Sequence, residues 1–392
     1  QGRLLEMREK QPFTENKVEE FASSGTYYFK SGSLMRQFLL EQISKQVTVG
    51  GEYYVSSAVD LVAQAGLNVA VYEIEHFMQW GTPQDLGEYL YWSELFRQLA
   101  NSTRRDDLVK GIEYLGVLAG GLGARFKQVG YGLHKSLLKI SGRTILEQAL
   151  KASSARPYFL AVKSSEVAEY ISKNQLGDLV VVDSLTDGQA RSAMLLVESS
   201  SQQLEESITI VPSDTMYLDE SGALAKIIEQ ESGDYFAVWV TSPTPFSTAK
   251  PENFAWIGQP GGTLATAFKC APDFENPKMV SGAFTFSSRG VFERLTRRLI
   301  ASGLRVKSEF YLDSLILIAE QEGVQVKTFE PTLSISLGTP YEFETYRYWQ
   351  SCFDRWPSHP YSLDLDPFVS KNDIAEVRSE LARTKHRPNE WI

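Results

Sequence analysis

A glycine-rich segment with two cations is the part of the chain whose residue types best suit phosphate chemistry. Residues 118–135 read LAGGLGARFKQVGYGLHK, and the apolar run 114–118 before them is typical of a buried parallel strand. Glycines let backbone N–H groups approach phosphate oxygens, while Arg125 and Lys135 would neutralise charge. A helical pattern follows at 144–150. This order predicts a triphosphate site, and a tight turn that needs glycine for steric reasons alone is the alternative.

Two commoner glycine loops are excluded by the residues themselves. A dinucleotide fingerprint needs glycine where Phe126 stands, and the Gly-Lys-Ser/Thr of a P-loop is absent from the segment. The loop therefore belongs to another class of phosphate-binding turn.

The segments around this loop alternate between two hydrophobic patterns. Strand-like segments lie at 158–163, 178–183, 207–211 and 235–240, and helix-like segments lie at 166–173 and 190–198. Such alternation predicts an α/β fold, with a Rossmann-like, mostly parallel sheet and helices on both faces. Ligands of such sheets bind beyond the carboxyl ends of the strands, which is where the glycine loop begins.

Two further positions at strand ends carry polar groups that suit a nucleotide. Asp214 follows 207–211 directly, and a carboxylate there can hold Mg²⁺ against phosphate oxygens; an Asx-turn or a helix cap is the alternative. Gly188 and Gln189 lie between a strand-like and a helix-like segment. The Gln189 amide can donate and accept at once, which suits the edge of a base, and a polar helix start is the alternative.

The spacing of these residues resembles the sugar-1-phosphate nucleotidyltransferase family. The resemblance rests on Gly-Gly-x-Gly-x-Arg-Phe at 120–126, on Gly130-Tyr131 and Lys135, and on the segment 140–147. It is strongest for the bacterial branch that serves capsule and surface-polysaccharide synthesis, where Gly-Tyr-x-x-Pro-Lys-Pro is usual. This chain departs from that pattern, because His134 and Ser136 stand where the two prolines are expected.

The resemblance implies a Mg²⁺-dependent reaction in which a sugar-1-phosphate oxygen attacks the α-phosphorus of an NTP and releases pyrophosphate. The implied catalytic residues are Arg125, Lys135 and Asp214, and the implied nucleotide-binding residues are Leu118, Ala119, Gly120, Gly121, Gly123, Gly188 and Gln189. The implied substrate-binding residues are Lys269, Gly282 and Glu309, and the implied metal ligands are Asp214 and Asp313. A catalytically silent nucleotidyltransferase-like binding or scaffold protein, and a nucleotidyltransferase for a non-sugar phosphate such as phosphocholine, stay open as alternatives.

Glu309 and Lys269 each lie beside a residue that bears on their predicted roles. Glu309 and Asp313 are four residues apart and share a face in either a strand or a helix; Asp313 is preferred as the metal ligand, and a cap or surface role is the alternative for Glu309. Lys269 resembles the lysine of the family's Glu-Lys element, but Phe268 replaces the glutamate.

The chain also contains an internal sequence repeat. At a shift of 257 residues, the segments 24–96 and 281–353 share 20 identical residues without a gap, whereas unrelated sequences would share about four or five. The Glu-Lys pair missing at 268–269 is present as Glu9-Lys10, and Ser56 stands where the second copy has Asp313. The Gly-Thr-Pro turns and the Tyr/Trp stripes that follow them are predicted to be structural.

This repeat divides the chain into four predicted parts. Residues 1–98 are the C-terminal, sugar-binding part of a first nucleotidyltransferase copy, 99–113 a linker, 114–356 a complete second copy, and 357–392 a tail with a helix at 373–383. The truncation of the first copy has two open explanations, a fragment of a tandem enzyme or the loss of a nucleotide-binding half.

Composition narrows the setting and the partners. The net charge of −10 argues against a nucleic-acid or anionic-membrane binder, and no apolar run is long enough to span a bilayer. Only Cys270 and Cys352 occur, which favours a reduced, cytoplasmic setting with both as buried free thiols. The expected partners are an NTP and a sugar-1-phosphate, and a homo-oligomer stays open.

Overall fold

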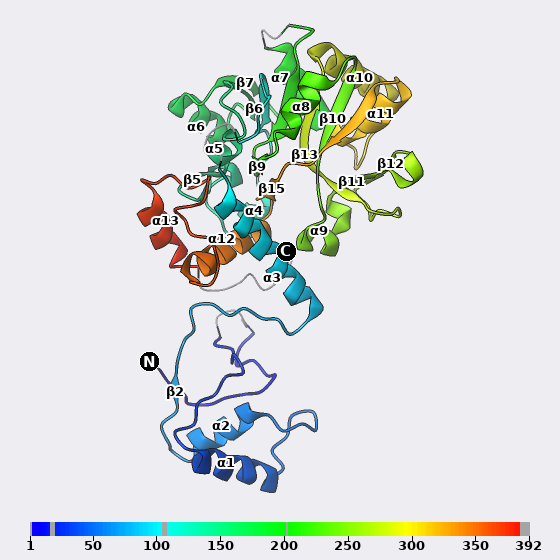
Figure 1. Cartoon of the computed structure of the whole chain (residues 1–392). Coiled ribbons are helices and arrows are strands. Elements are labelled where there is room, and N and C mark those ends of the chain that lie inside the picture. Colours follow the sequence, from blue (N-terminus) through cyan, green and yellow to red (C-terminus); the bar gives the residue numbers. More distant parts are fainter. Residues whose placement is uncertain (1, 16–19, 104–107, 201–202, 385–392) are drawn as a thin grey trace. The chain divides into compact units, whose positions relative to one another are not determined.

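The chain divides into two compact units. This computed structural model describes residues 2–15, 20–103, 108–200 and 203–384. Unit 1 comprises residues 1–78 and unit 2 comprises residues 79–392 (Figure 1). Residues 104–107 of the predicted linker and residues 385–392 of the predicted tail lie outside the described residues.

A nine-stranded sheet forms the centre of unit 2 in the order β12-β11-β13-β8-β3-β6-β7, with β10 paired to both β13 and β14 (Figure 1). Its strands are β3 (Leu115–Leu118), β6 (Pro157–Val162), β7 (Asp178–Val182), β8 (Ile208–Pro212), β10 (Tyr235–Thr241), β11 (Ala255–Gly258), β12 (Ala265–Phe268), β13 (Lys278–Phe286) and β14 (Gln325–Phe329). The strands β8, β3, β6 and β7 are parallel to one another, and every antiparallel pair involves β11 or β13. The predicted α/β fold with a mostly parallel sheet is confirmed.

Helices cover both faces of this sheet because each face is apolar. On one face, α7 (Gln189–Glu198), α10 (Arg289–Ser302) and α11 (Leu315–Gln321) bury side chains such as Leu295 in one core. On the other face, α5 (Ile145–Leu150), α6 (Glu166–Asn174) and α8 (Ala223–Gln230) bury side chains such as Ile171 in a second core. The strands and helices predicted around the glycine loop therefore exist, with ends that differ by one or two residues.

Shorter elements complete unit 2. Two small ribbons pair β4 (Lys139–Ile140) with β5 (Arg143–Thr144) and β9 (Thr215–Leu218) with β15 (Leu333–Ser336). The remaining helices are α3 (Pro83–Asn101), α4 (Ala124–Gln128), α9 (Pro245–Ala249), α12 (Pro340–Arg355) and α13 (Ile374–Leu381), and the 3₁₀ turns are η2 (Lys135–Leu137), η3 (Pro251–Asn253), η4 (Pro260–Gly262) and η5 (Leu312–Ser314).

The helices α3 and α12 pack on one another through matched aromatic side chains. The ring centres of Tyr89 and Trp349 lie 5.9 Å apart, and those of Trp92 and Tyr346, the same pair with the helices exchanged, lie 6.2 Å apart. The aromatic stripes therefore pack helices, as predicted. The contacts also place α3 in unit 2, although the sequence comparison assigned residues 1–98 to the first copy.

Unit 1 is smaller and has little regular sheet. Its helices are α1 (Gly32–Ser44) and α2 (Val55–Gln64), and its strands β1 (Gly2–Arg3) and β2 (Ala70–Val71) form an antiparallel pair. Phe38, Leu61 and Val62 form its buried core.

The two thiols differ in environment. Cys352 is buried in α12, where burial raises its pKa to about 12. Cys270 is exposed, so the prediction that both thiols are buried was wrong for Cys270, which lies in the turn after β12. Within the described residues, no helix combines the length and the apolar character needed to cross a membrane.

Candidate active site

The glycine loop leaves the carboxyl end of β3 at the middle of the sheet. The Ala119 amide still donates to the Leu160 carbonyl at 2.9 Å, and the chain then turns away into α4. Gly123 begins α4 with a φ of 64°, and a β-carbon there would lie 3.1 Å from the His134 ring. This position therefore requires glycine for both its backbone conformation and its close approach to His134.

Lys135 and Asp214 meet beside this loop. Lys135 lies in η2, and Asp214 follows β8, the parallel neighbour of β3. The Lys135 Nζ lies 2.5 Å from the Asp214 Oδ2, and both side chains are largely but not fully buried. The structure therefore places the two predicted catalytic residues in direct contact at the carboxyl edge of the sheet.

This contact keeps Asp214 charged. Burial raises the pKa of the Asp214 carboxyl, but the charge and the hydrogen bond of Lys135 outweigh it, so that the pKa is lowered overall. Asp214 is therefore a carboxylate at neutral pH, which is the form that binds a divalent cation.

His134 holds the loop through two hydrogen bonds, a role that the sequence did not indicate. Its Nε2 lies 2.7 Å from the Gly121 carbonyl oxygen, and its Nδ1 accepts from the Ser136 amide at 3.2 Å. Because Nδ1 accepts, Nε2 carries the proton and donates to Gly121. Burial lowers the pKa of His134 further, which favours this neutral form. The residue that departs from the family pattern thus connects the glycine loop to η2.

The amino end of α12 lies against Asp214, which the sequence also did not indicate. The Leu337 amide donates to the Asp214 carbonyl at 2.9 Å, and a β-carbon on Gly338 would lie 3.1 Å from the Asp214 Oδ2. Further along α12, Glu344 accepts a hydrogen bond from the Tyr131 hydroxyl of the glycine segment. The repeated Gly-Thr-Pro turn was the signal for this helix start, but not for its contact with Asp214.

A second cluster forms around Lys269 at the end of β12. The Lys269 Nζ donates to the Asn253 carbonyl at 2.7 Å and lies 5.2 Å from the centre of the Tyr311 ring. Burial lowers the pKa of Lys269, and the nearby Asp313 partly opposes this shift. Burial also raises the pKa of Tyr311 to about 12, with a contribution from its hydrogen bond to Glu309. The predicted substrate residues Lys269 and Glu309 therefore both interact with Tyr311.

Asp313 belongs to this second cluster. It is buried, and burial raises the pKa of its carboxyl against the opposing charge of Lys269. Within the described residues, no group of three His, Cys, Asp or Glu side chains could hold a metal ion. Of the two predicted metal ligands, Asp214 pairs with Lys135 and Asp313 interacts with Lys269.

The other predicted residues lie around these clusters. The charge of Arg125 lowers the pKa of both Lys269 and Tyr311, so its guanidinium acts on the second cluster. Gly282 has a φ of 85° and faces Pro212 at the end of β8. A β-carbon on Gly188 would lie 2.4 Å from the Phe310 carbonyl oxygen, so the loop that carries the exposed Gln189 runs beside the backbone of the second cluster.

Comparison with known proteins identifies the part of the chain that carries these clusters. Residues 115–306 match the MobA-like NTP transferase domain. These residues form a nucleotidyltransferase domain. They include the glycine loop, Lys135, Asp214 and Lys269, whereas Asp313 and α12 lie beyond the matched segment. No curated protein matches the chain.

Solved structures resemble about three fifths of the chain at low sequence identity. A nucleoside-diphosphate-sugar pyrophosphorylase from Vibrio cholerae RC9 is 21% identical, with 59% of this chain and 98% of that chain covered and a TM-score of 0.48. The inositol-1-phosphate CTP transferase from T. maritima is 14% identical, with 61% and 95% covered and a TM-score of 0.46.

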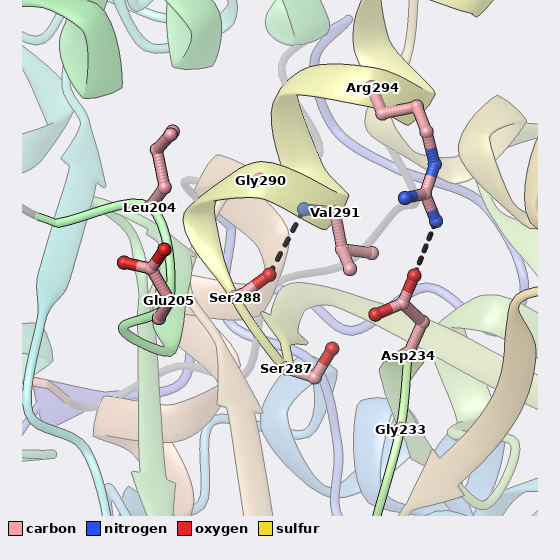
Figure 2. Close-up of a pocket in the computed structure, with 9 residues that line it drawn as sticks. All are labelled: Leu204, Glu205, Gly233, Asp234, Ser287, Ser288, Gly290, Val291 and Arg294. Carbon is pink, nitrogen blue, oxygen red and sulfur yellow. Dashed lines mark hydrogen bonds and ion pairs between the residues drawn. The ribbon is translucent and has the colours of Figure 1, made fainter.

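The hollow drawn in Figure 2 is lined by none of the residues of the two clusters. It measures about 520 Å³ and is lined by Leu204, Glu205, Gly233, Asp234, Ser287, Ser288, Gly290, Val291 and Arg294. Asp234 precedes β10 and Ser287 follows the antiparallel β13, so the hollow lies at the amino ends of the parallel strands. Arg294 is paired with Asp234 at 2.6 Å, and Ser288 caps the first turn of α10. The hollow therefore lacks an available cation and lies at the opposite edge from the glycine loop.

Proposed function

We propose that unit 2 joins an NTP to a sugar-1-phosphate and releases pyrophosphate. The observation that carries the proposal is the contact between Lys135 and Asp214 beside the glycine loop, at the carboxyl ends of the adjacent strands β3 and β8. A cation and a carboxylate beside backbone amides suit a bound triphosphate better than any other ligand class.

The reaction needs alignment and charge neutralisation more than proton transfer. A sugar-1-phosphate oxygen is already anionic; it forms a bond to the α-phosphorus while the bond from that phosphorus to the bridging oxygen breaks and pyrophosphate leaves. Lys135 would stabilise charge on the transferring phosphoryl group, and Arg125 would hold the leaving pyrophosphate. In the absence of nucleotide, Lys135 neutralises Asp214 instead.

Asp214 fits a magnesium ion, and we include Mg²⁺ in the proposal. Mg²⁺ keeps several waters and is usually held by one or two carboxylates together with substrate phosphates, so a single ionised aspartate beside the glycine loop is sufficient protein ligation. When bound, the ion would neutralise charge on the triphosphate. Asp313 remains the predicted second ligand, and its buried position beside Lys269 suits contact with the second substrate equally well.

The second cluster supports a phosphorylated, hydroxyl-bearing second substrate. Lys269 would meet the phosphate as a compact positive charge, while Glu309 and Asp313 would accept hydrogen bonds from hydroxyl groups. Gly188 and Gln189 would contact the base. The resemblance in the glycine loop supports a further part of the proposal, namely that the nucleotide sugar serves surface-polysaccharide synthesis in the cytoplasm.

The test is Mg²⁺-dependent pyrophosphate release, measured with a panel of NTPs and sugar-1-phosphates. Lys135→Ala should lower kcat by about 10²- to 10³-fold, the typical cost of removing one charge-stabilising group. Lys139→Ala is the matched control, because Lys139 is an exposed lysine four residues away that pairs with Glu376 at 2.8 Å. Wild-type protein that binds NTP without releasing pyrophosphate would identify a silent binding protein. Turnover with phosphocholine but with no sugar phosphate would show that the second substrate is a non-sugar phosphate.

A further inference from the structure

Unit 1 contains a lysine–tyrosine–glutamate cluster of its own. The Lys10 Nζ donates to the Tyr54 hydroxyl and lies 4.6 Å from the centre of the Tyr54 ring. The Tyr54 hydroxyl in turn donates to Glu52, whose Oε2 lies 3.9 Å from the Lys10 Nζ.

This cluster has the same chemistry and local backbone as the second cluster of unit 2. Tyr54 and Tyr311 are related by the repeat (311 − 54 = 257), as are Glu52 and Glu309 (309 − 52 = 257). The lysines correspond two residues out of step (269 − 10 = 259), and both have left-handed backbones, with φ of 56° and 54°. Because non-glycine residues seldom adopt this conformation, a shared φ at both lysines indicates one local structure built twice.

The two clusters also carry one carboxyl group on opposite members of a matching pair of residues. In unit 1, Ser56 donates a hydrogen bond to Glu9, the residue before Lys10. In unit 2 the corresponding residues are Asp313 (313 − 56 = 257) and Phe268 (268 − 9 = 259), which line one small hollow. Each cluster therefore keeps one carboxyl group at this pair of positions, on opposite partners.

Retention of the lysine, tyrosine and both carboxyl groups favours a ligand-binding role over a structural one. Lys10 and Glu52 are exposed and Glu9 and Tyr54 are half-buried, so these four side chains contribute little to a buried core. A lysine suits a phosphate group, and carboxylates suit hydroxyl groups. Its two carboxylates outnumber its one cation, which favours a ligand rich in hydroxyl groups over a bare phosphate ion.

We propose that Glu9, Lys10, Glu52 and Tyr54 form a second binding site for a sugar phosphate, in unit 1. The class of ligand rests on the function proposed for unit 2, because it is taken from the matching cluster there. The site itself rests on the geometry of unit 1 alone.

The test uses the whole chain labelled with 3-fluorotyrosine and followed by ¹⁹F NMR during titration with glucose 1-phosphate. Variants Tyr54→Phe and Tyr311→Phe assign one signal in each unit. The Tyr54 signal should move in the wild type and in Lys269→Met, and the movement should be lost in Lys10→Met. Lys45→Met is the matched control, since Lys45 is an exposed lysine of unit 1 that directly follows α1 and pairs with Glu41 of that helix at 2.6 Å.

The outcomes separate this proposal from the function proposed for unit 2. A Tyr54 signal that stays fixed while Tyr311 moves overturns the second site and leaves the unit 2 site intact. Equal movement of Tyr54 in wild type and Lys10→Met also overturns it. A fixed Tyr311 signal together with absent pyrophosphate release would overturn the function of unit 2, while the Tyr54 signal still reports on unit 1. Titration with inorganic phosphate and with glucose shows which group of the ligand is recognised.

Discussion

Residues 24–101 and residues 281–355 have matching helix caps and turns in different surroundings. The helices α1 and α10 begin after Ser31 and Ser288, and α3 and α12 begin after Thr82 and Thr339; each pair is 257 residues apart, and each of these side chains caps its helix. Left-handed residues also coincide at this shift, as Gly25 with Gly282, Gln46 with Gly303, Gly50 with Lys307, Gly51 with Ser308 and Gly66 with Gly323. These are correspondences of local structure, and the duplication itself stays a prediction.

The two segments differ in side-chain burial at positions where their local structure agrees. Tyr28 is 92% exposed, whereas its counterpart Thr285 is fully buried in β13. Tyr72 is 76% exposed, whereas its counterpart Phe329 is 1% exposed in β14. In unit 2 these positions are covered by the other strands of the nine-stranded sheet and by its helices. Caps and turns therefore define the elements in both copies, and the nucleotide-binding half supplies the core in unit 2.

The largest expected effect comes from the burial difference itself. Phe329→Ala should lower the free energy of unfolding of unit 2 by about 3–5 kcal/mol, because it leaves a cavity beside Trp239, whose ring centre lies 4.8 Å away. Tyr72→Ala should change the stability of unit 1 by less than about 0.5 kcal/mol. Every tryptophan lies beyond residue 79, so tryptophan fluorescence in urea reports on unit 2 and circular dichroism adds unit 1. A large loss for Tyr72→Ala would mean that this ring is covered in solution.

The opposite placement of one carboxyl group in the two clusters gives the next largest effect. Asp313→Ser copies Ser56 into unit 2 and removes the carboxyl group whose charge acts most strongly on Lys269, so kcat/KM should fall by about 10²-fold. Adding Phe268→Glu recreates the Glu9–Ser56 pair and should recover about tenfold of that loss. Asp273→Ser, at an exposed aspartate after β12, is the control. If the double variant is no better than the single one, the two positions do not substitute for each other.

The sequence predicted the elements of this comparison but not all of their contacts. The glycine loop, the alternation of strands and helices, and the positions of Lys135 and Asp214 follow from local spacing and hydrophobic periodicity. The hydrogen bond from His134 to Gly121 and the contact of Gly338 with Asp214 join segments that lie apart in the chain, so no local pattern encodes them. The boundary at residue 78 was not predicted for the same reason, because α3 belongs to unit 2 through contacts with distant segments such as α12.

Acidification should change the contributions of Asp313 and Asp214 to fold stability in opposite directions. Ser56, the counterpart of Asp313, cannot titrate. Burial raises the folded-state pKa of Asp313, so its protonation stabilises the fold at low pH and this contribution is lost as pH rises from about 4. Asp313→Asn should therefore gain stability relative to wild type between about pH 4 and pH 7. The pKa of Asp214 is lowered, so its charged form stabilises the fold above about pH 4 and this contribution is lost as pH falls below that value, which should bring Asp214→Asn closer to wild type in stability below about pH 4. Urea titrations without metal at several pH values measure both differences, and parallel slopes for the two variants would contradict this assignment.

The helix caps should give equal effects on stability and unequal effects on turnover. Thr82→Ala and Thr339→Ala each remove a side chain that accepts from the third residue of a helix, at a cost of about 1 kcal/mol. Only the α12 cap adjoins Asp214, through Gly338. Thr339→Ala should therefore also lower kcat, whereas Thr82→Ala should not. Equal losses of turnover would show that α3 and α12 position the active site together through their aromatic contacts.

The smallest expected effect comes from a position where both segments have a left-handed backbone but different residues, Ser308 and Gly51. Ser308 has a φ of 69°, and its counterpart Gly51 has a φ of 82°. A left-handed backbone costs an L-residue about 1–2 kcal/mol, while glycine loses about 0.5–1 kcal/mol of extra entropy on folding. Ser308→Gly should therefore raise the stability of unit 2 by several tenths of a kcal/mol, up to about 1 kcal/mol, and the hydrogen bond from Arg305 to the Ser308 carbonyl is kept. Gly51→Ser should lower the stability of unit 1 by a similar amount, since no atom lies within 4 Å of a β-carbon there and only the backbone conformation matters. Changes of the same sign in both variants would mean that the serine side chain, and not the left-handed backbone, decides stability at this turn.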